Sequence, residues 1–161
     1  MKMLRTLLAA VALVAVLGIT QNATAQSSAT IQARAQVQAA LAVTAARDLD
    51  FGTVIAGSSY SVGTGQPESG RWNLTGEASK GVALTFTLPN ELTGTGSPVP
   101  IHTWNAFFSG AGTTFTPVSG QTYNHFLTGG ALSVFIGATI APPVGASGSY
   151  SAPIVLTVAY L

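Results

Sequence analysis

A run of alternating apolar and polar residues near the start of the chain narrows the possible folds more than any other feature. Between Ala29 and Val43 every odd position is apolar, whereas Thr30, Gln32 and Arg34 are among the residues at even positions. A period of two is typical of a β-strand that buries one face. Strands usually run about 5–6 residues, so this run predicts a strand much longer than one sandwich needs.

The first 25 residues have the pattern of an export signal. Lys2 and Arg5 give a short basic start, residues 7–19 are almost wholly apolar, and residues 23–25 (Ala-Thr-Ala) suit a signal peptidase. Cleavage after them would leave a mature chain that begins at Gln26. The apolar run is short for a membrane span. We therefore expect a secreted protein with no membrane span in its mature part; a retained N-terminal anchor is the alternative.

Charged side chains are scarce, at 7% of the whole sequence against 47% hydrophobic residues. Without the signal, four basic side chains remain against five acidic ones, a net charge of −1. So few cations cannot neutralise a row of phosphates, which argues against nucleic-acid binding and against electrostatic adhesion to anionic lipid. There is no cysteine, so stability must come from burial and strand pairing. A surface this poor in charge is unusual for a soluble monomer, and burial against other molecules is one explanation.

After the signal, helix patterns are nearly absent and short alternating runs lie between clusters of Gly, Ser, Pro and Asn. The best runs are residues 71–76, 81–88, 130–140 and 149–161, whereas residues 94–119 are irregular with weaker strands. We predict an all-β fold of about eight strands, an antiparallel β-sandwich, with a closed barrel as the alternative. The apolar phases of the runs predict a single core that contains Phe51, Leu84, Phe86, Leu132, Val134, Ile136, Ile154, Leu156 and Val158.

No set of residues has the spacing of a catalytic, cofactor or metal site. His102 and His125 have no further ligand at the short spacing that zinc sites use. Asp48 and Asp50 lie close in sequence, but calcium requires six or more oxygens. The stretch Gly145–Ser149 only approximates the Gly-x-Ser-x-Gly pattern of a nucleophile elbow. We expect a protein that is not an enzyme and has no cofactor, although a catalytic triad needs only to meet in space.

Several aromatic residues have two possible roles. Trp104, Phe107 and Phe108 are candidates for an exposed surface that stacks on sugars or adheres to a partner. Aromatic side chains of a small sandwich without cysteine are more often core. The tripeptide that begins at Asn73 also matches the pattern of a glycosylation acceptor.

The order of four motifs carries a resemblance to known families. They are "LDFGTVIAG" at 49–57, "LTG" at 74–76, "GALSVFIGATI" at 130–140 and "SGSYSAPIVLTVAYL" at 147–161. Together they resemble a bacterial secreted family, the domain of unknown function number 4402, over most of residues 39–161. The Leu-x-Phe-Gly start and the Val-x-Tyr end are also similar to spore-coat-U-type pilins of the chaperone–usher kind, which commonly carry cysteines that this chain lacks.

The resemblance to these pilins implies a fold and an assembly mechanism. Such pilins have an incomplete immunoglobulin-like sandwich, and the N-terminal extension of the next subunit supplies the missing strand. It therefore implies self-association into a homopolymer, a periplasmic chaperone and an outer-membrane usher as partners, and a location on the bacterial cell surface reached through the periplasm.

The long first run divides naturally under that hypothesis. Residues 26–36 would be an N-terminal extension, with Ala29, Ile31, Ala33 and Ala35 as the donor-strand residues, and residues 37–161 the sandwich domain, whose first strand is Val37 to Thr44. Fifteen residues span about 50 Å when extended at about 3.3 Å each, enough to serve two domains. The alternative is that the strand bends between two sheets of its own domain through Ala39 and Ala40.

The sequence thus predicts an extracellular structural subunit of a pilus or fibre that polymerises by donor-strand complementation. The alternative is a monomeric cell-surface or matrix module that binds through its exposed aromatic residues.

Overall fold

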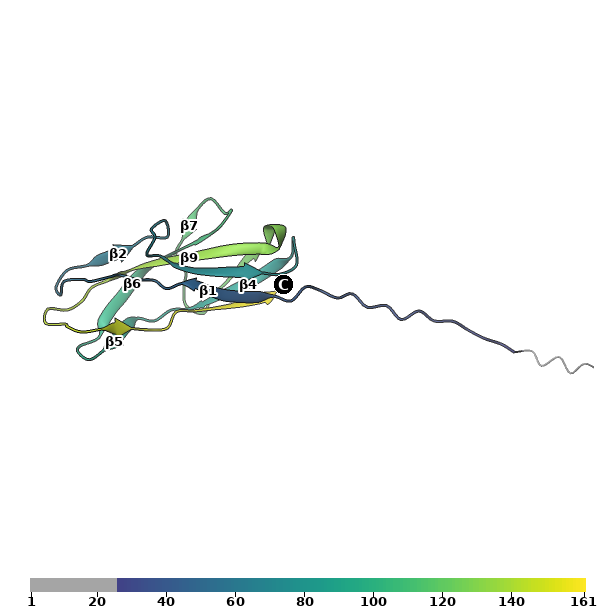
Figure 1. The fold of residues 1–161 in the computed structure, drawn as a ribbon, viewed down its shortest axis with the longest axis horizontal. Helices are drawn as coiled ribbons and strands as arrows, with labels where there is room; N and C mark the ends of the chain where they lie inside the picture. Colours follow the sequence, from purple (N-terminus) through teal and green to yellow (C-terminus); the bar gives the residue numbers. More distant parts are fainter. Residues whose placement is uncertain (1–25) are drawn as a thin grey trace, which may run out of the picture. The chain divides into compact units, whose positions relative to one another are not determined.

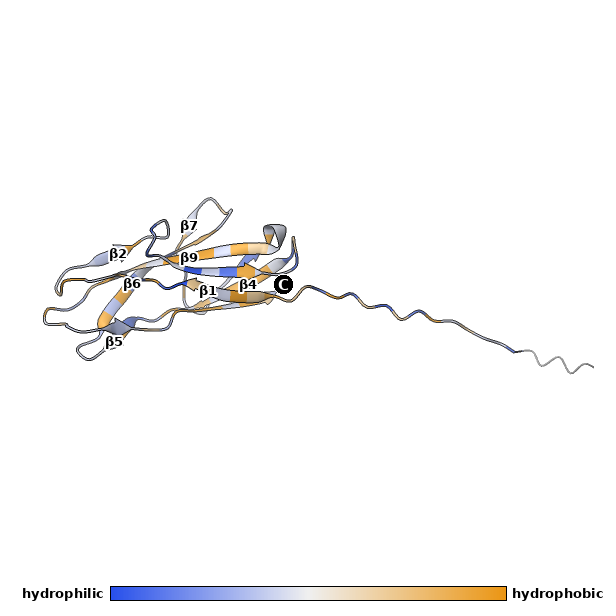
Figure 2. Cartoon of the chain, viewed as in Figure 1, coloured by the Kyte–Doolittle hydropathy of each residue, from blue (hydrophilic) through white to orange (hydrophobic). Residues whose placement is uncertain are grey.

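The computed structural model describes residues 26–161 (Figure 1). The chain divides into two compact units between Gln36 and Val37. In the first unit, residues 26–36 form neither helix nor strand, run extended and are exposed throughout. Figure 2 shows their alternation of apolar and polar residues. In the second unit the first strand, β1 (Ala42–Arg47), begins only at Ala42.

The second unit consists of two antiparallel sheets. The larger sheet has the order β1, β3 (Gly70–Thr75), β9 (Ala131–Ile140), β6 (Val99–Phe108), β5 (Glu91–Gly94) and β10 (Tyr150–Ser151), while β2 (Tyr60–Val62) pairs with β9 and β7 (Thr114–Phe115) with β6. The smaller sheet has the order β11 (Val155–Tyr160), β4 (Gly81–Thr87) and β8 (Thr122–Phe126). A short 3-10 turn, η1 (Thr128–Gly130), precedes β9.

The two sheets share one hydrophobic core, which makes the unit a β-sandwich. Leu74 and Ile136 of the larger sheet belong to the same buried cluster as Leu84, Phe86 and Leu156 of the smaller one. The predicted all-β antiparallel sandwich is therefore confirmed. A second cluster at the end of the sandwich contains Val99, Ile101, Ala138 and Ile140.

The predicted core is confirmed except at one residue. Leu84, Phe86, Leu132, Val134, Ile136 and Leu156 are buried in the first cluster, and Ile154 and Val158 pack against it. Phe51 packs instead against the second cluster, because residues 48–59 form no strand and run along the end of the sandwich.

Two strands differ from their predicted form. The C-terminal run is two strands in different sheets, β10 and β11, separated at Pro153, which has no N–H for a ladder. The segment predicted as weak and irregular contains β6, a strand of ten residues between β9 and β5. A register shift between His102 and Asn105, with Thr103 at φ 53°, breaks the alternation of β6 and so hides it in the sequence.

Within residues 26–161, no helix is both long and apolar enough to cross a membrane.

Candidate functional site

The most prominent site is a groove between the free edges of the two sheets. Within residues 26–161, β1 pairs with β3 alone and β11 pairs with β4 alone, so each ends its sheet. An edge strand presents N–H and C=O groups that can pair with a further strand. Both edges therefore offer a ladder to a strand placed between them.

The side of β1 that faces the interior is not covered. Residues opposite each other on an antiparallel pair point to the same side of the sheet. Val43 lies opposite Leu74 and Ala45 lies opposite Trp72, so both face the core. Leu74 is 1% exposed, but Val43 is 41% exposed and Ala45 is exposed as well. The apolar side chains on the inner face of β1 are therefore left uncovered within residues 26–161.

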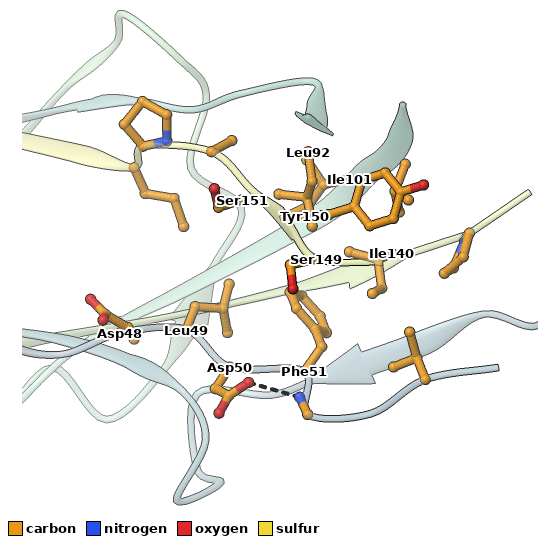
Figure 3. Close-up of a pocket in the computed structure, with 18 of the residues that line it drawn as sticks. Asp48, Leu49, Asp50, Phe51, Leu92, Ile101, Ile140, Ser149, Tyr150 and Ser151 are labelled. Carbon is orange, nitrogen blue, oxygen red and sulfur yellow. Dashed lines mark hydrogen bonds between the residues drawn. The ribbon is translucent and has the colours of Figure 1, made fainter. Parts of the chain in front are cut away.

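The uncovered side of β1 continues into a cavity of about 900 Å³, which we call the acceptor groove. One wall is the end of β1 with residues 48–56, and the other is the chain that leads through β10 to Ile154. Leu49, Phe51, Ile101, Ile140 and Tyr150 give it an apolar lining (Figure 3).

Exposed polar side chains also line the acceptor groove. They come from Asp48, Asp50, Ser149 and Ser151 (Figure 3). The Asp50 carboxylate accepts a hydrogen bond of 2.8 Å from the N–H of Gly52, which fixes the turn after β1. The groove thus has both buried apolar side chains and exposed polar ones in its lining.

A tyrosine ties the beginning of the second unit to the end of β11. The Tyr160 hydroxyl donates to the carbonyl of Ala39 at 2.9 Å and accepts from the N–H of Glu77 at 2.6 Å. The Glu77 carboxylate accepts from the N–H of Ala39 at 2.9 Å. The two edges are therefore joined near Tyr160, and the acceptor groove opens near Ile154, at the other end of β11.

The predicted donor residues belong to the first unit and form no strand there. Ala29, Ile31, Ala33 and Ala35 are exposed, and Ile31 is 93% exposed. A large β-branched side chain with so much exposed surface is a candidate for burial in a complex.

The structure separates the three predicted surface aromatics. Phe108 is buried in the core, with its ring centroid 4.8 Å from that of Phe115, and it cannot belong to an exposed surface. Trp104 is half-buried and packs against both clusters. Phe107 is half-buried on the outer side of β6. Side chains alternate along β6 after its register shift, so Phe107 and Phe108 point to opposite faces. This alternation places Phe107 on the outer side of the sheet and Phe108 in the core.

The histidines and carboxylates do not come together. The Nδ1 atom of His102 lies 2.8 Å from the hydroxyl of Thr103, and the His125 ring lies 5.0 Å from that of Phe108. Among the described residues there is no group of three or more His, Cys, Asp or Glu side chains that would hold a metal. The absence of enzymatic activity and of a cofactor stays a prediction.

Sequence reasoning did not find the acceptor groove. Its lining comes from residues 48–56 and 146–154, segments that form little regular structure. One signal was present: Leu49, Phe51 and Val54 form an apolar stretch that the structure leaves outside any strand.

Comparisons with known proteins give one structural likeness. Neither a scan against protein-family models nor a search of curated proteins finds a match. A chain from a chaperone–usher pilus, whose structure was solved to explain rod uncoiling, matches with a TM-score of 0.46 and 19% identity, over 89% of this chain and 100% of that one. At this TM-score, the fold assignment rests on the sheets themselves, and the resemblance to the family numbered 4402 stays a prediction.

Proposed function

We propose that the protein is an extracellular structural subunit that polymerises head to tail. Residues 26–36 of one copy would enter the acceptor groove of the next and pair with β1 and β11. The observation that carries this proposal is the uncovered inner side of β1, where Val43 is 41% exposed opposite a fully packed Leu74. A strand inserted there would complete the sandwich.

The extension has the properties that an inserted strand requires. Its alternation places Ala29, Ile31, Ala33 and Ala35 on one face, while the even positions from Thr30 to Gln36 are polar. The backbone would supply ladder hydrogen bonds to both edges, and the apolar face would enter the groove. Full burial of Ile31 alone is worth about 1.5–3 kcal/mol.

Insertion into a second copy is favoured over a return into the same sandwich. Ala39 is held at the end of β11 by the hydroxyl of Tyr160. A return would require a tight turn close to this point, but residues 36–41 (Gln-Val-Gln-Ala-Ala-Leu) contain none of the Gly, Pro, Asn, Asp or Ser residues that favour turns.

The same proposal includes export of the protein and the help of a chaperone and an usher. Residues 1–25, outside the described part of the chain, have the pattern of a signal peptide. An open groove between two free edges promotes aggregation until it is filled. A periplasmic chaperone would cover the groove before assembly, and an outer-membrane usher would deliver the subunit to the cell surface.

A peptide-complementation experiment tests the proposal. The protein of residues 37–161 is mixed with a peptide of residues 26–36. At a peptide concentration about 100 times Kd, binding raises the free energy of unfolding by about 2.7 kcal/mol and the melting temperature by about 10 °C. A peptide with Arg34→Ala should act equally, because this position is on the polar face. A peptide with Ile31→Asp should have no effect, because an unpaired carboxylate would enter an apolar groove.

Two results would count against the proposal. The first is no change in melting temperature with the unaltered peptide. The second is equal stabilisation by the Ile31→Asp peptide.

A second candidate function is a monomeric binding module, which the half-exposed ring of Phe107 supports. A mature protein that stays monomeric and binds a glycan would favour that candidate.

A further inference from the structure

The outer face of the larger sheet carries a row of residues directly opposite one another on neighbouring strands. Arg47 of β1 lies opposite Arg71 of β3, Arg71 opposite Phe135 of β9, Phe135 opposite Phe107 of β6, and Phe107 opposite Thr114 of β7. With neighbouring strands about 4.8 Å apart, these five residues, the arginine–phenylalanine row, extend about 19 Å across the sheet.

Arg71 is held in a fixed orientation within the row. Its Cζ atom lies 5.4 Å from the centroid of the Phe135 ring, a cation–π distance. Its Nε donates to Asn73 Oδ1 at 3.0 Å and its Nη2 to Ser133 Oγ at 3.2 Å. Ser133 in turn donates to Asn73 Oδ1 at 3.0 Å. The Nη1 group has no hydrogen-bond partner within residues 26–161.

Arg47 is oriented in a similar way. Its Nε donates to the carbonyl of Ser69 at 2.7 Å and its Nη2 to the hydroxyl of Ser69 at 2.9 Å. Ser69 is itself fully buried, so this anchor is rigid. The Arg47 and Arg71 guanidinium groups are thus each fixed by hydrogen bonds, and each has donors left for a ligand.

The aromatic end of the row lines a hollow. The Phe107 and Phe135 rings have their centroids 6.0 Å apart at an interplanar angle of 45°. Together with Arg47, Thr114 and residues 64–67, they line a surface hollow of about 670 Å³. The lining contains aromatic faces, a cation, hydroxyl groups and an amide, and no carboxylate.

The charge arrangement of the row is unfavourable without a ligand. Residues 37–161 contain only three basic side chains, Arg47, Arg71 and Lys80. Like charges directly opposite each other on two strands destabilise a sheet. A carboxylate that accepts from both guanidinium groups would remove this repulsion and form charge-assisted hydrogen bonds.

We propose that the arginine–phenylalanine row binds an acidic polysaccharide. A sugar carboxylate would lie between Arg47 and Arg71, and pyranose rings would stack on Phe135 and Phe107. A sugar fits better than an acidic peptide, because the backbones of β3, β9 and β6 are paired on both sides and leave no edge for an added strand. Hydroxyl and amide groups at Thr64, Gln66 and Thr114 suit sugar hydroxyls.

The row and the acceptor groove share Arg47, at the end of β1. The rest of the row occupies the outer face of the larger sheet, whereas the groove contains the inward-facing Trp72 and Ile136. Glycan binding at Arg71, Phe135 and Phe107 can therefore hold or fail whether or not the protein polymerises. If it does form a fibre, each subunit presents one row, and the fibre gains avidity for a repeating polymer.

Calorimetric titration of the mature chain with a galacturonic acid oligomer tests the proposal. A maltose oligomer of equal length tests whether binding requires the sugar carboxylates. An oligoglutamate peptide tests whether carboxylates without sugar rings are enough. We expect the galacturonic acid oligomer alone to bind, with an affinity that falls as salt is added. Arg47→Gln, Arg71→Gln and Phe135→Ala should each weaken binding by about tenfold or more. Lys80→Gln removes the same charge outside the row and should leave the affinity unchanged.

Several outcomes would overturn the proposal. They are no binding of the galacturonic acid oligomer, equal affinity for the maltose oligomer, equal or higher affinity for oligoglutamate, or an equal loss with Lys80→Gln. Melting temperatures of the variants separate lost binding from lost folding. Arg47 is exposed, so we expect Arg47→Gln to fold. This variant therefore tests the loss of binding even where Arg71→Gln fails to fold.

Discussion

At the scale of single residues, Phe86 holds the two sheets together. It is 0% exposed, and its ring centroid lies 6.3 Å from Trp72, 6.3 Å from Phe115 and 5.8 Å from Tyr123. Removal of this ring would leave a cavity at the centre of the first cluster. Phe86→Ala should lower the free energy of unfolding by about 3–5 kcal/mol, measured by denaturant titration. Phe126→Ala, at a site 65% exposed, should change it by less than about 0.5 kcal/mol.

Tyr160 is the second residue with a defined role, because its hydroxyl joins Ala39 to Glu77. Tyr160→Phe keeps the ring and removes only the hydroxyl. We expect the free energy of unfolding to fall by about 1–2 kcal/mol, because the two hydrogen bonds are partly exposed. Hydrogen exchange at the amides of Ala39 and Glu77 should become faster. Unchanged exchange at both amides would show that the hydroxyl does not hold the two segments together.

At the scale of elements, β1 is the strand on which the proposed function depends. Ala45 faces the acceptor groove and is exposed, so Ala45→Asp should leave the monomer stability nearly unchanged but stop polymerisation. Thr44→Asp is the matched control, because it places the same charge on the opposite face of the same strand. Sedimentation of the two variants checks this. Polymers of equal length from both would mean that the donor does not pass Ala45.

The sequence predicted the apolar phase of β4 and β9 correctly because each of them has strand partners and a buried face. The same alternation in residues 29–41 forms no strand. Alternation indicates which face of a strand would be buried, but it does not indicate which chain supplies the neighbouring strand. The alternation therefore predicts candidate donor residues, and their role as a donor stays a prediction. The acceptor groove could not be predicted, because its walls are segments without regular alternation, and the arginine–phenylalanine row depends on strand register that composition does not reveal.

At the scale of the whole molecule, the proposed polymerisation would explain the low charge, the exposed apolar residues and the free edges together. Charged residues make up 7% of the chain, and Ile31 and Val43 are exposed although both belong to an apolar face. A subunit that inserts one segment into its neighbour buries these surfaces only after assembly. The stability of the polymer would then exceed that of the monomer, since the inserted strand adds hydrogen bonds and buried area to each sandwich.

Electron microscopy of two secreted proteins, residues 26–161 and residues 37–161, tests this claim most directly. Both contain the complete second unit, β1 to β11, and they differ only in the proposed donor. We expect filaments from the longer protein and folded monomers from the shorter one. Filaments of normal length from residues 37–161 would contradict donation through the N-terminal extension.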